Sequence, residues 1–315
     1  LAGIPSPLLI GDITAFVSYQ RSFVNPILNI ANIVNQLQSA IAGAERIFKV
    51  IDEEEELNEI LEKDYLPNEI EGHVKLDNVD FSYSEEVELI KDLNLEVQPG
   101  KQIAIVGHTG AGKTTLVNLL MRFYDIDDGA IYIDGQKTTE IPRVTLRKHF
   151  GMVLQDTWLF SGTIKENVAY GKADATDEEI IEACKKAHVH HYIETLPDGY
   201  DTVLKEDADN ISQGQKQLLT IARAILFDPK ILILDEATSS VDTRTESYIQ
   251  NAMLKMMEGK TSFVIAHRLS TIKNANTILV MEHGKIVEQG NHHELLEVNG
   301  VYADLYQSQF LNKPI

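Results

Sequence analysis

A glycine-rich stretch that ends in Lys-Thr constrains the fold of this chain more than any other feature. The sequence GHTGAGKT occupies residues 107–114, directly after an aliphatic run at residues 103–106 and directly before a run typical of a helix at residues 115–120. Glycines let the backbone amides of such a loop turn inward, and the helix start adds the positive end of its dipole. The order of strand, glycine-rich loop and helix therefore predicts an α/β fold with a phosphate-binding loop.

The residue types of this loop suit a nucleoside triphosphate and its metal ion. Lys113 supplies a point charge for the β- and γ-phosphates, and Thr114 offers its hydroxyl to Mg²⁺. We therefore expect ATP to be bound along the whole loop, by Gly107, His108, Thr109, Gly110, Ala111, Gly112, Lys113, Thr114 and Thr115.

A pair of acidic residues follows a second aliphatic run. Residues 231–234 are four consecutive aliphatics, which indicates a strand buried on both faces of a parallel sheet. Ligands of such sheets bind beyond the carboxyl ends of the strands, where Asp235 and Glu236 fall. Asp235 suits the hydrated Mg²⁺, and Glu236 is placed to polarise an attacking water. Combined with the loop, the pair predicts hydrolysis of ATP.

The composition and charge restrict the class of protein. The 315 residues exceed one typical domain, and 43% hydrophobic with 24% charged residues is typical of a globular chain. A balance of 28 basic against 48 acidic residues, a net charge of −20, disfavours nucleic acid as a partner because phosphate backbones are bound by clustered Lys and Arg. The single cysteine, Cys184, excludes an internal disulfide and is expected to be a small buried apolar side chain. Two groups of histidines are expected to lie on solvated helix surfaces rather than to bind a metal, namely His188, His190, His191, His292 and His293.

The first fifty residues differ from the rest. Residues 22–44 carry no charge and are long enough to span a bilayer. Their apolar residues follow helical spacing on one side, while Asn, Gln and Ser residues share the opposite side. Such a helix is expected to pack on other helices or to project from a membrane into water; the alternative is a helix packed on its own soluble domain. Pro26 is expected to kink this helix or to mark a weak point.

An acidic stretch separates this helix from the β-rich part of the chain. Between residues 52 and 71, ten Asp or Glu residues stand against the single Lys63. We expect a solvated linker here and a domain boundary near residue 71. The chain opens with Leu1 and has no basic n-region, so the sequence is expected to be a piece of a longer protein rather than to begin with a secretory signal.

Further segments, in a fixed order, resemble motifs of one protein family. Residues 210–215, Asn-Ile-Ser-Gln-Gly-Gln, resemble the signature motif of ABC ATPases, and residues 235–242 resemble their Walker B motif joined to the D-loop. Residues 264–268 look like the segment of the switch histidine. Gln155 is then the Q-loop glutamine and Tyr83 the A-loop aromatic. From about residue 72 to residue 310, the chain is similar to the nucleotide-binding domain of an ABC transporter.

Finer similarities are to exporter half-transporters. Residues 158–167 are similar to theirs, and short runs within residues 13–48 look like the end of their last transmembrane helix. This resemblance implies a subunit that drives efflux from the cytoplasmic face of the cell membrane. It also implies the domain organisation: a remnant of the transmembrane domain at residues 1–50, an acidic linker at 51–71, and the nucleotide-binding domain at 72–315, with a helical subdomain at about 156–226.

The fold implied by the family is a P-loop α/β ATPase. Its core is a mixed sheet, to which an antiparallel β subdomain and an inserted helical subdomain are joined. In this chain an N-terminal helical extension precedes that fold.

The family architecture places each ATP between the phosphate loop of one domain and the signature of a second domain. Tyr83 would stack on adenine, and Gln155 would reach Mg²⁺ and the attacking water and connect the site to the transmembrane domain. His267 would hydrogen-bond the γ-phosphate and orient Glu236. The second domain would place Ser212, Gly214 and Gln215 near the γ-phosphate, with Asp242 at the dimer seam. The resemblance thus implies catalytic roles for Lys113, Gln155, Glu236 and His267, and metal binding by Thr114, Gln155 and Asp235.

The signature departs from the common family pattern. That pattern is Leu-Ser-Gly-Gly-Gln, whereas Ile211 and Gln213 occupy its first and third positions here. If the third position needs a positive φ, Gln213 would be strained by about 1–3 kcal/mol. A homodimer is favoured over a heterodimer with one weakened ATP site, and a non-transport ABC ATPase is the remaining alternative. The sequence allows a drug, a lipid or a peptide as the transported substrate.

Overall fold

The computed structural model describes residues 10–53, 69–84, 87–154, 157–205, 208, 210–235, 241–266 and 268–308. By its internal contacts the chain divides into two units, residues 1–58 and residues 59–315. Each unit is described by itself.

The first unit contains a long helix, α1 (Ile10–Ile51). None of its side chains is buried, and large apolar residues such as Phe23 and Ile30 are exposed by 73% and 62%. Pro26 lies inside α1, which continues on both sides of it, so the expected weak point does not interrupt the helix. Among the helices that the structure describes, none combines the length and the apolar character needed to cross a membrane.

The second unit begins with an antiparallel sheet of four strands in the order β2-β1-β4-β5. The long strands β1 (Val74–Ser84) and β2 (Val87–Val97) form a hairpin, and β4 (Asp128–Ile133) pairs with the other edge of β1. The short β5 (Gln136–Lys137) closes the sheet after a tight turn.

The second sheet has six strands in the order β12-β11-β3-β10-β9-β6. Five of them run parallel, and β12 pairs antiparallel with β11 at the edge. The strands are β3 (Gln102–Val106), β6 (Phe150–Val153), β9 (Ile231–Asp235), β10 (Thr261–Ile265), β11 (Thr277–Glu282) and β12 (Lys285–Gly290). Together with the antiparallel sheet and the helices, this mixed sheet is the fold that the sequence predicts.

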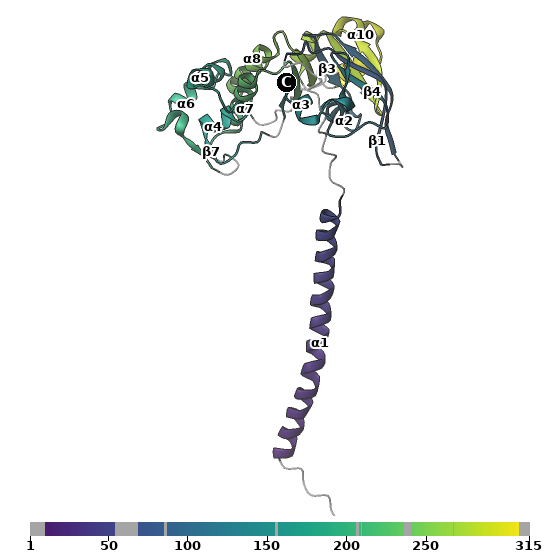
Figure 1. Ribbon diagram of the computed structural model, residues 1–315, viewed down its shortest axis with the longest axis vertical. Coiled ribbons are helices and arrows are strands. Elements are labelled where there is room, and N and C mark those ends of the chain that lie inside the picture. The colour runs from purple at the N-terminus through teal and green to yellow at the C-terminus, as the bar shows by residue number, and fades with distance from the viewer. Residues whose placement is uncertain are drawn as a thin grey trace, which may run out of the picture. The chain divides into compact units, whose positions relative to one another are not determined.

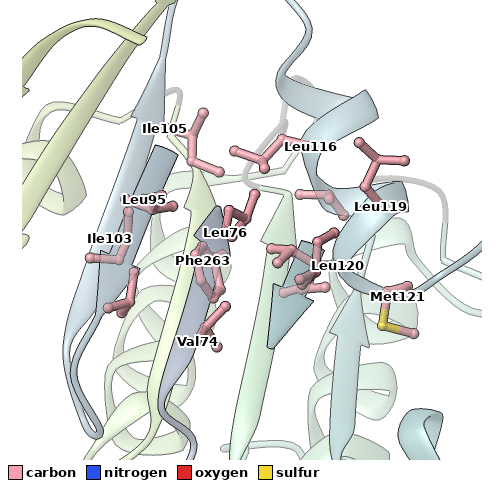
Figure 2. Packing of buried hydrophobic residues seen from close by; sticks show 14 of the residues in the cluster. Val74, Leu76, Leu95, Ile103, Ile105, Leu116, Leu119, Leu120, Met121 and Phe263 are labelled. Atoms are coloured by element: carbon pink, nitrogen blue, oxygen red, sulfur yellow. The ribbon is translucent and has the colours of Figure 1, made fainter. Parts of the chain in front are cut away.

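Both sheets and the helix α2 (Lys113–Leu120) share one hydrophobic core. Figure 2 shows Val74 and Leu76 of the antiparallel sheet close to Phe263 of the mixed sheet, with Leu116 and Leu120 of α2 nearby. The phosphate loop therefore lies between a strand and a helix that are both anchored in the same core.

The opposite face of the mixed sheet carries the helical part of the unit. Strand β9 contributes Ile231 and Ile233 to the first core and Leu232 and Leu234 to a second one, as expected of a strand covered on both faces. In Figure 1, the helices of this part gather toward one end of the unit and the antiparallel sheet lies at the other. Its helices are α4 (Ile164–Ala169), α5 (Asp177–Lys186), α6 (His190–Glu194), α7 (Gln213–Phe227) and α8 (Thr243–Met257), and β7 (Gly162–Thr163) pairs with β8 (Val203–Leu204).

Cys184 is fully buried in this second core, as expected. Burial raises the pKa of its thiol to about 12, although a hydrogen bond with Tyr200 acts in the opposite direction.

The position of His292 in the C-terminal helices differs from the expectation that this histidine lies on a solvated helix surface. His292 lies in α10 (His292–Val298) and is only 7% exposed, so it is not on a solvated surface. Its Nδ1 lies 2.6 Å from the hydroxyl of Tyr302 in α11 (Val301–Tyr306), which satisfies the buried imidazole. The helix α9 (Leu269–Asn274) precedes β11.

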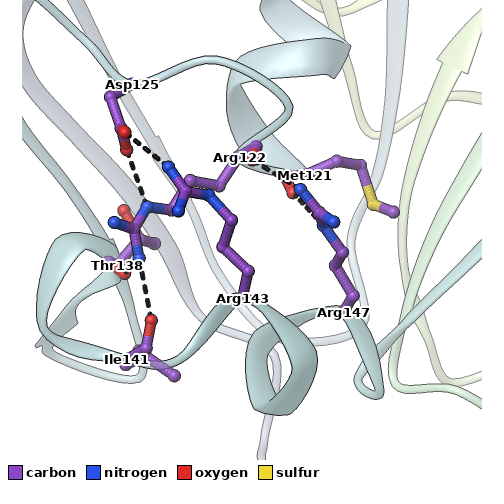
Figure 3. Close-up of polar contacts among 7 residues, drawn as sticks. All are labelled: Met121, Arg122, Asp125, Thr138, Ile141, Arg143 and Arg147. Atoms are coloured by element: carbon purple, nitrogen blue, oxygen red, sulfur yellow. Dashed lines mark hydrogen bonds and ion pairs between the residues drawn. The ribbon is translucent and has the colours of Figure 1, made fainter. Parts of the chain in front are cut away.

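An arginine network fixes the segment that follows α2 (Figure 3). Arg122 is buried and donates to the carbonyl oxygens of Thr138 and Ile141, while its Nε bonds to Asp125. Two residues of α3 (Arg143–Arg147) complete the network: Arg143 bonds to Asp125, and Arg147 donates to the carbonyl oxygens of Met121 and Arg122. Two short 3-10 helices, Thr138–Glu140 and Gly199–Asp201, complete the helical elements described.

Candidate functional site

Two glycines of the phosphate loop, residues 107–114, lie where the backbone does not accommodate a side chain without a clash or strain. Gly107 has φ +152°, and a Cβ added there would lie 2.3 Å from the carbonyl oxygen of Met281. Gly112 has φ +98° at the N-cap of α2, a left-handed conformation that glycine adopts without strain. The sequence therefore needs glycine at both positions for local geometric reasons.

A cavity of about 370 Å³ opens above this loop. It lies at the carboxyl ends of β3 and β9, the edge where parallel sheets bind ligands. Its walls are formed by Leu89, Thr109, Gly110, Ala111, Gly112, Lys113, Thr114, Thr115, Asp235 and Ile265.

Two opposite charges face this cavity. The Nζ of Lys113 donates to the carbonyl oxygens of Gly107 at 2.8 Å and of His108 at 2.9 Å. Partial burial lowers the pKa of the Lys113 ammonium, and the charge of Asp235 opposes that shift. The Oδ1 atom of Asp235 is buried and has no hydrogen-bond partner among the residues described. The walls of the cavity thus carry an ammonium group and a carboxylate, and the buried oxygen of that carboxylate has no partner among the residues described.

Tyr83 lies at the end of β1 near the helix that follows the loop. Its hydroxyl is 3.2 Å from Oγ1 of Thr115, while its side chain is largely exposed. The Tyr83 ring makes edge-on contacts with Phe81 and with Tyr124, at centroid distances of 4.9 and 5.0 Å. Tyr124 could not be predicted from the sequence, because it follows α2 and lies 41 positions after its neighbour Tyr83.

The predicted signature segment forms the start of α7. Ser212 is the N-cap, and a capping box joins its side chain and that of Gln215 to each other's backbone amides. Gly214 is buried, and a Cβ added there would lie 2.5 Å from Cγ2 of Thr245 and 3.0 Å from Cγ1 of Val241. The glycine is therefore needed for the close packing of α7 against α8.

Gln213 adopts an ordinary helical conformation, so the condition for strain at this position is not met. It is the first residue of α7 and is absent from the residues with positive φ. Its Nε2 donates to Oγ1 of Thr157 at 3.2 Å. The side chain at the third signature position is accommodated without backbone strain in this chain.

Comparison with known proteins identifies the family. Residues 90–239 match the family model described as ABC transporter. A fatty acid ABC transporter ATP-binding/permease protein of Mycobacterium bovis is 54% identical over 95% of this chain. The chain belongs to the ABC transporters. A solved bacterial Atm1-family ABC exporter with ATP bound matches 98% of the chain, with a TM-score of 0.78 and 37% identity.

Other ABC transporter relatives have export functions in their names. A putative multidrug export ATP-binding/permease protein of Bacillus subtilis is 46% identical over 98% of this chain, and an ATP-dependent lipid A-core flippase of Legionella pneumophila is 42% identical over 95%. The chain spans about half the length of these relatives, 47% of the mycobacterial protein and 53% of the Bacillus one. It covers 54% of the solved exporter chain. The match to their ATP-binding domain confirms the predicted family and fold.

Asp242, the predicted seam residue of the ABC dimer, is the N-cap of α8. Its exposed carboxylate accepts hydrogen bonds from the amides of Arg244 and Thr245, and these bonds, above all that from Thr245, lower the pKa of Asp242. It therefore stays ionised over the physiological range and stabilises the start of α8.

The structure brings together only part of the predicted ABC site. The loop from Thr109 to Thr115 and Asp235 line one cavity, and Tyr83 is bonded to the helix behind it. None of the described signature and D-loop residues lines that cavity. The remaining predictions, Gln155, Glu236 and His267, fall outside the described residues.

Proposed function

We propose that this chain is the ATP-binding and ATP-hydrolysing part of an ABC exporter at the cytoplasmic face of the cell membrane. The observation that carries this proposal is the cavity lined by the glycine-rich loop, Lys113 and Asp235, whose Oδ1 atom has no hydrogen-bond partner among the residues that the structure describes. The names of the related proteins support export, since they include a multidrug export protein and a lipid A-core flippase.

Mg²⁺ fits the donor set of this cavity. Mg²⁺ prefers oxygen ligands, and the cavity is lined by Thr114, which is exposed, and by Asp235, whose buried Oδ1 atom has no partner in the described part of the chain. Gln155 is proposed as a further ligand on the family pattern alone. When bound, the metal neutralises charge on the phosphate oxygens during hydrolysis.

The proposed chemistry is attack of water on the γ-phosphate of ATP. Glu236 follows Asp235 directly at the end of β9, so it is proposed to accept the proton of the attacking water, and His267 to orient Glu236. Lys113 stays close to the phosphates because two loop carbonyls hold its ammonium group. Tyr83, with its largely exposed ring, is proposed to stack on adenine.

The proposed active assembly contains two such domains arranged head to tail. Ser212, Gly214 and Gln215 are separate from the phosphate cavity of their own chain, so a second domain is needed to place them at the γ-phosphate. The start of α7 offers the positive end of a helix dipole to that charge. We propose a homodimer rather than a heterodimer, with Asp242 at the seam and contact to the transmembrane domain through the Q-loop region.

The decisive experiment measures the mass in solution of Glu236→Gln with and without Mg-ATP. Loss of the base should trap the closed dimer, so the mass should rise from 35.3 kDa to twice that value with ATP. Wild type and Glu178→Gln, which changes an exposed carboxyl in the first turn of α5, serve as controls and should remain monomeric as they turn ATP over. A mutant that binds ATP and stays monomeric would contradict the self-sufficient homodimer.

A further inference from the structure

We infer that the tip of the β11–β12 hairpin, His283 and Gly284, is a positioning element of the phosphate site. It holds the peptide between Ala111 and Gly112 in the orientation that presents an amide to a phosphate oxygen. This inference rests on the proposed ATP site and adds a residue that lies 170 positions after the phosphate loop in the sequence.

The hairpin tip is wedged between the phosphate loop and strand β2. The amide of Gly284 donates to the carbonyl oxygen of Ala111 at 3.0 Å. A Cβ added at Gly284 would lie 1.4 Å from the carbonyl oxygen of Leu89, and one added at Gly112 would lie 3.2 Å from Cα of Gly284. The backbone approach on both sides leaves no space for a side chain at Gly284.

This contact determines where the next amide of the loop points. In a trans peptide the carbonyl and the following N–H point in opposite directions. Because the carbonyl of Ala111 is directed to the hairpin, the N–H of Gly112 is directed away from it, and Gly112 lines the phosphate cavity. Within the described part of the chain, this N–H has no acceptor, whereas the N–H of Ala111 donates to His108 at 3.1 Å. The hairpin therefore orients a free donor before the ligand arrives, which lowers the entropic cost of binding.

A second hairpin turn in the same unit is a matched control. Asp134 and Gly135 connect β4 and β5 with φ values of 48° and 80°, and His283 and Gly284 have 48° and 74°. Positive φ at both central residues is typical of type I′ turns. A Cβ at Gly135, however, would meet no atom within 4 Å. Substitution of Gly135 by Ala thus introduces similar backbone strain without the contact to the phosphate loop.

The first test observes the Gly284 amide in the unmodified chain. His283-Gly284 is the sole His-Gly pair in the sequence, so labelling of His carbonyl carbons and Gly nitrogens gives one NMR resonance for this amide. Without nucleotide, its hydrogen exchange should be at least about tenfold slower than that of an unprotected glycine, because it is hydrogen-bonded. On titration with Mg-ADP or inorganic pyrophosphate the resonance should shift, although Gly284 itself does not line the cavity. Exchange at the unprotected rate, or no response to either ligand that binds, would overturn the inference.

The second test compares the affinities of Gly284→Ala and Gly135→Ala for Mg-ADP and for pyrophosphate. Gly284→Ala should bind both ligands about tenfold or more weakly, since the lost hydrogen bond frees the phosphate-binding peptide, and Gly135→Ala should stay within about twofold of wild type. Equal affinities in two variants that both unfold cooperatively would overturn the inference. If Gly284→Ala does not fold, the amide measurement decides the matter. If the wild-type chain binds no Mg-ADP, the proposed function is contradicted. The hydrogen-exchange rate of the Gly284 amide without nucleotide still tests the contact with Ala111 in that case, so the two failures can be distinguished.

Discussion

The phosphate loop and the signature segment each lead into a helix, but the first backbone amides of the two helices differ in whether a side chain accepts their hydrogen bonds. At α2 the N-cap is Gly112, in a left-handed conformation and with no side-chain cap. At α7 the N-cap is Ser212, whose hydroxyl accepts from Gln215 in a capping box. The unpaired amides at the start of a helix are available to a ligand in the first case and partly satisfied by the protein in the second.

The two segments also differ in how the rest of the chain surrounds them. Ala111, Gly112 and Thr115 are buried, and the first two contact the tip of the β11–β12 hairpin, whereas Ser212 and Gln213 are exposed. The phosphate-loop half of the proposed ATP site is thus held by packing within one chain, whereas the signature half is exposed on the surface. In the proposed head-to-tail assembly, this difference accounts for ATP binding by one chain and for hydrolysis that requires a second chain.

The largest effect is expected from removing the positive charge of the phosphate loop. Lys113→Ala deletes the ammonium group near the phosphates, and hydrogen bonds of charged groups contribute about 1.5–3 kcal/mol. We expect the affinity for ATP to fall about tenfold to a hundredfold in isothermal titration calorimetry. Lys101→Ala, at an exposed lysine, should bind as wild type does. Unchanged affinity in the Lys113 variant would mean that ATP binds elsewhere.

A smaller effect is expected where α7 meets α8. The Cβ of Gly214→Ala would overlap Cγ2 of Thr245, and such overpacking should lower the free energy of unfolding by about 1–2 kcal/mol in urea titrations, after allowance for the better helix propensity of Ala. Thr245→Ser removes the clashing methyl group. The two changes should therefore cost less together than the sum of their separate effects, and strict additivity would contradict the contact.

Ser212→Ala tests whether the exposed helix start has a role beyond capping. Loss of an N-cap side chain lowers stability by about 1 kcal/mol, and Thr176→Ala removes the same capping box from α5. Both variants should lose similar stability in thermal denaturation. In the Glu236→Gln background, only Ser212→Ala should weaken the ATP-dependent dimer in sedimentation experiments. Equal dimerisation of both variants would restrict Ser212 to its capping role.

The smallest effect is expected at Gln213. Because this residue has no positive φ, Gln213→Gly relieves no strain and should lower the free energy of unfolding by only about 0.5 kcal/mol, through the flexibility of glycine and the loss of the bond to Thr157. Chemical denaturation with Lys216→Ala in the same helix as a reference measures this change. A gain of 1 kcal/mol or more would show that the departure from the common signature does strain the chain.

The sequence predicts those parts of the site whose geometry depends on residues that are adjacent in the chain. The glycines, Lys113 and Thr114 lie in one loop between a strand and a helix, and Asp235 follows directly from the aliphatic strand before it. Short-range patterns of this kind determine both the element and the atoms it presents. The mixed sheet as a whole was expected from the resemblance to the family, whereas the aliphatic runs alone indicated only the buried strands β3 and β9.

The parts that the sequence does not predict depend on neighbours far along the chain. The need for glycine at position 284 arises from the carbonyl groups of Leu89 and Ala111, which only the folded sheet brings close. The imidazole of His292 can be buried because it forms a hydrogen bond with the hydroxyl of Tyr302. The strain considered at Gln213 depended on its φ angle, which the residue type does not specify. Tertiary packing, rather than residue type, decided each of these positions.

The buried Cys184 makes the chain a convenient background for spectroscopic labels. Burial raises the pKa of this thiol to about 12, so little of the thiolate, the form that reacts with maleimides and spin labels, is present at neutral pH. A single cysteine introduced at an exposed position would therefore carry the probe alone, with the native residue left in place. Pairs of such labels on two copies of the chain could follow the approach of a phosphate loop and a signature helix in real time.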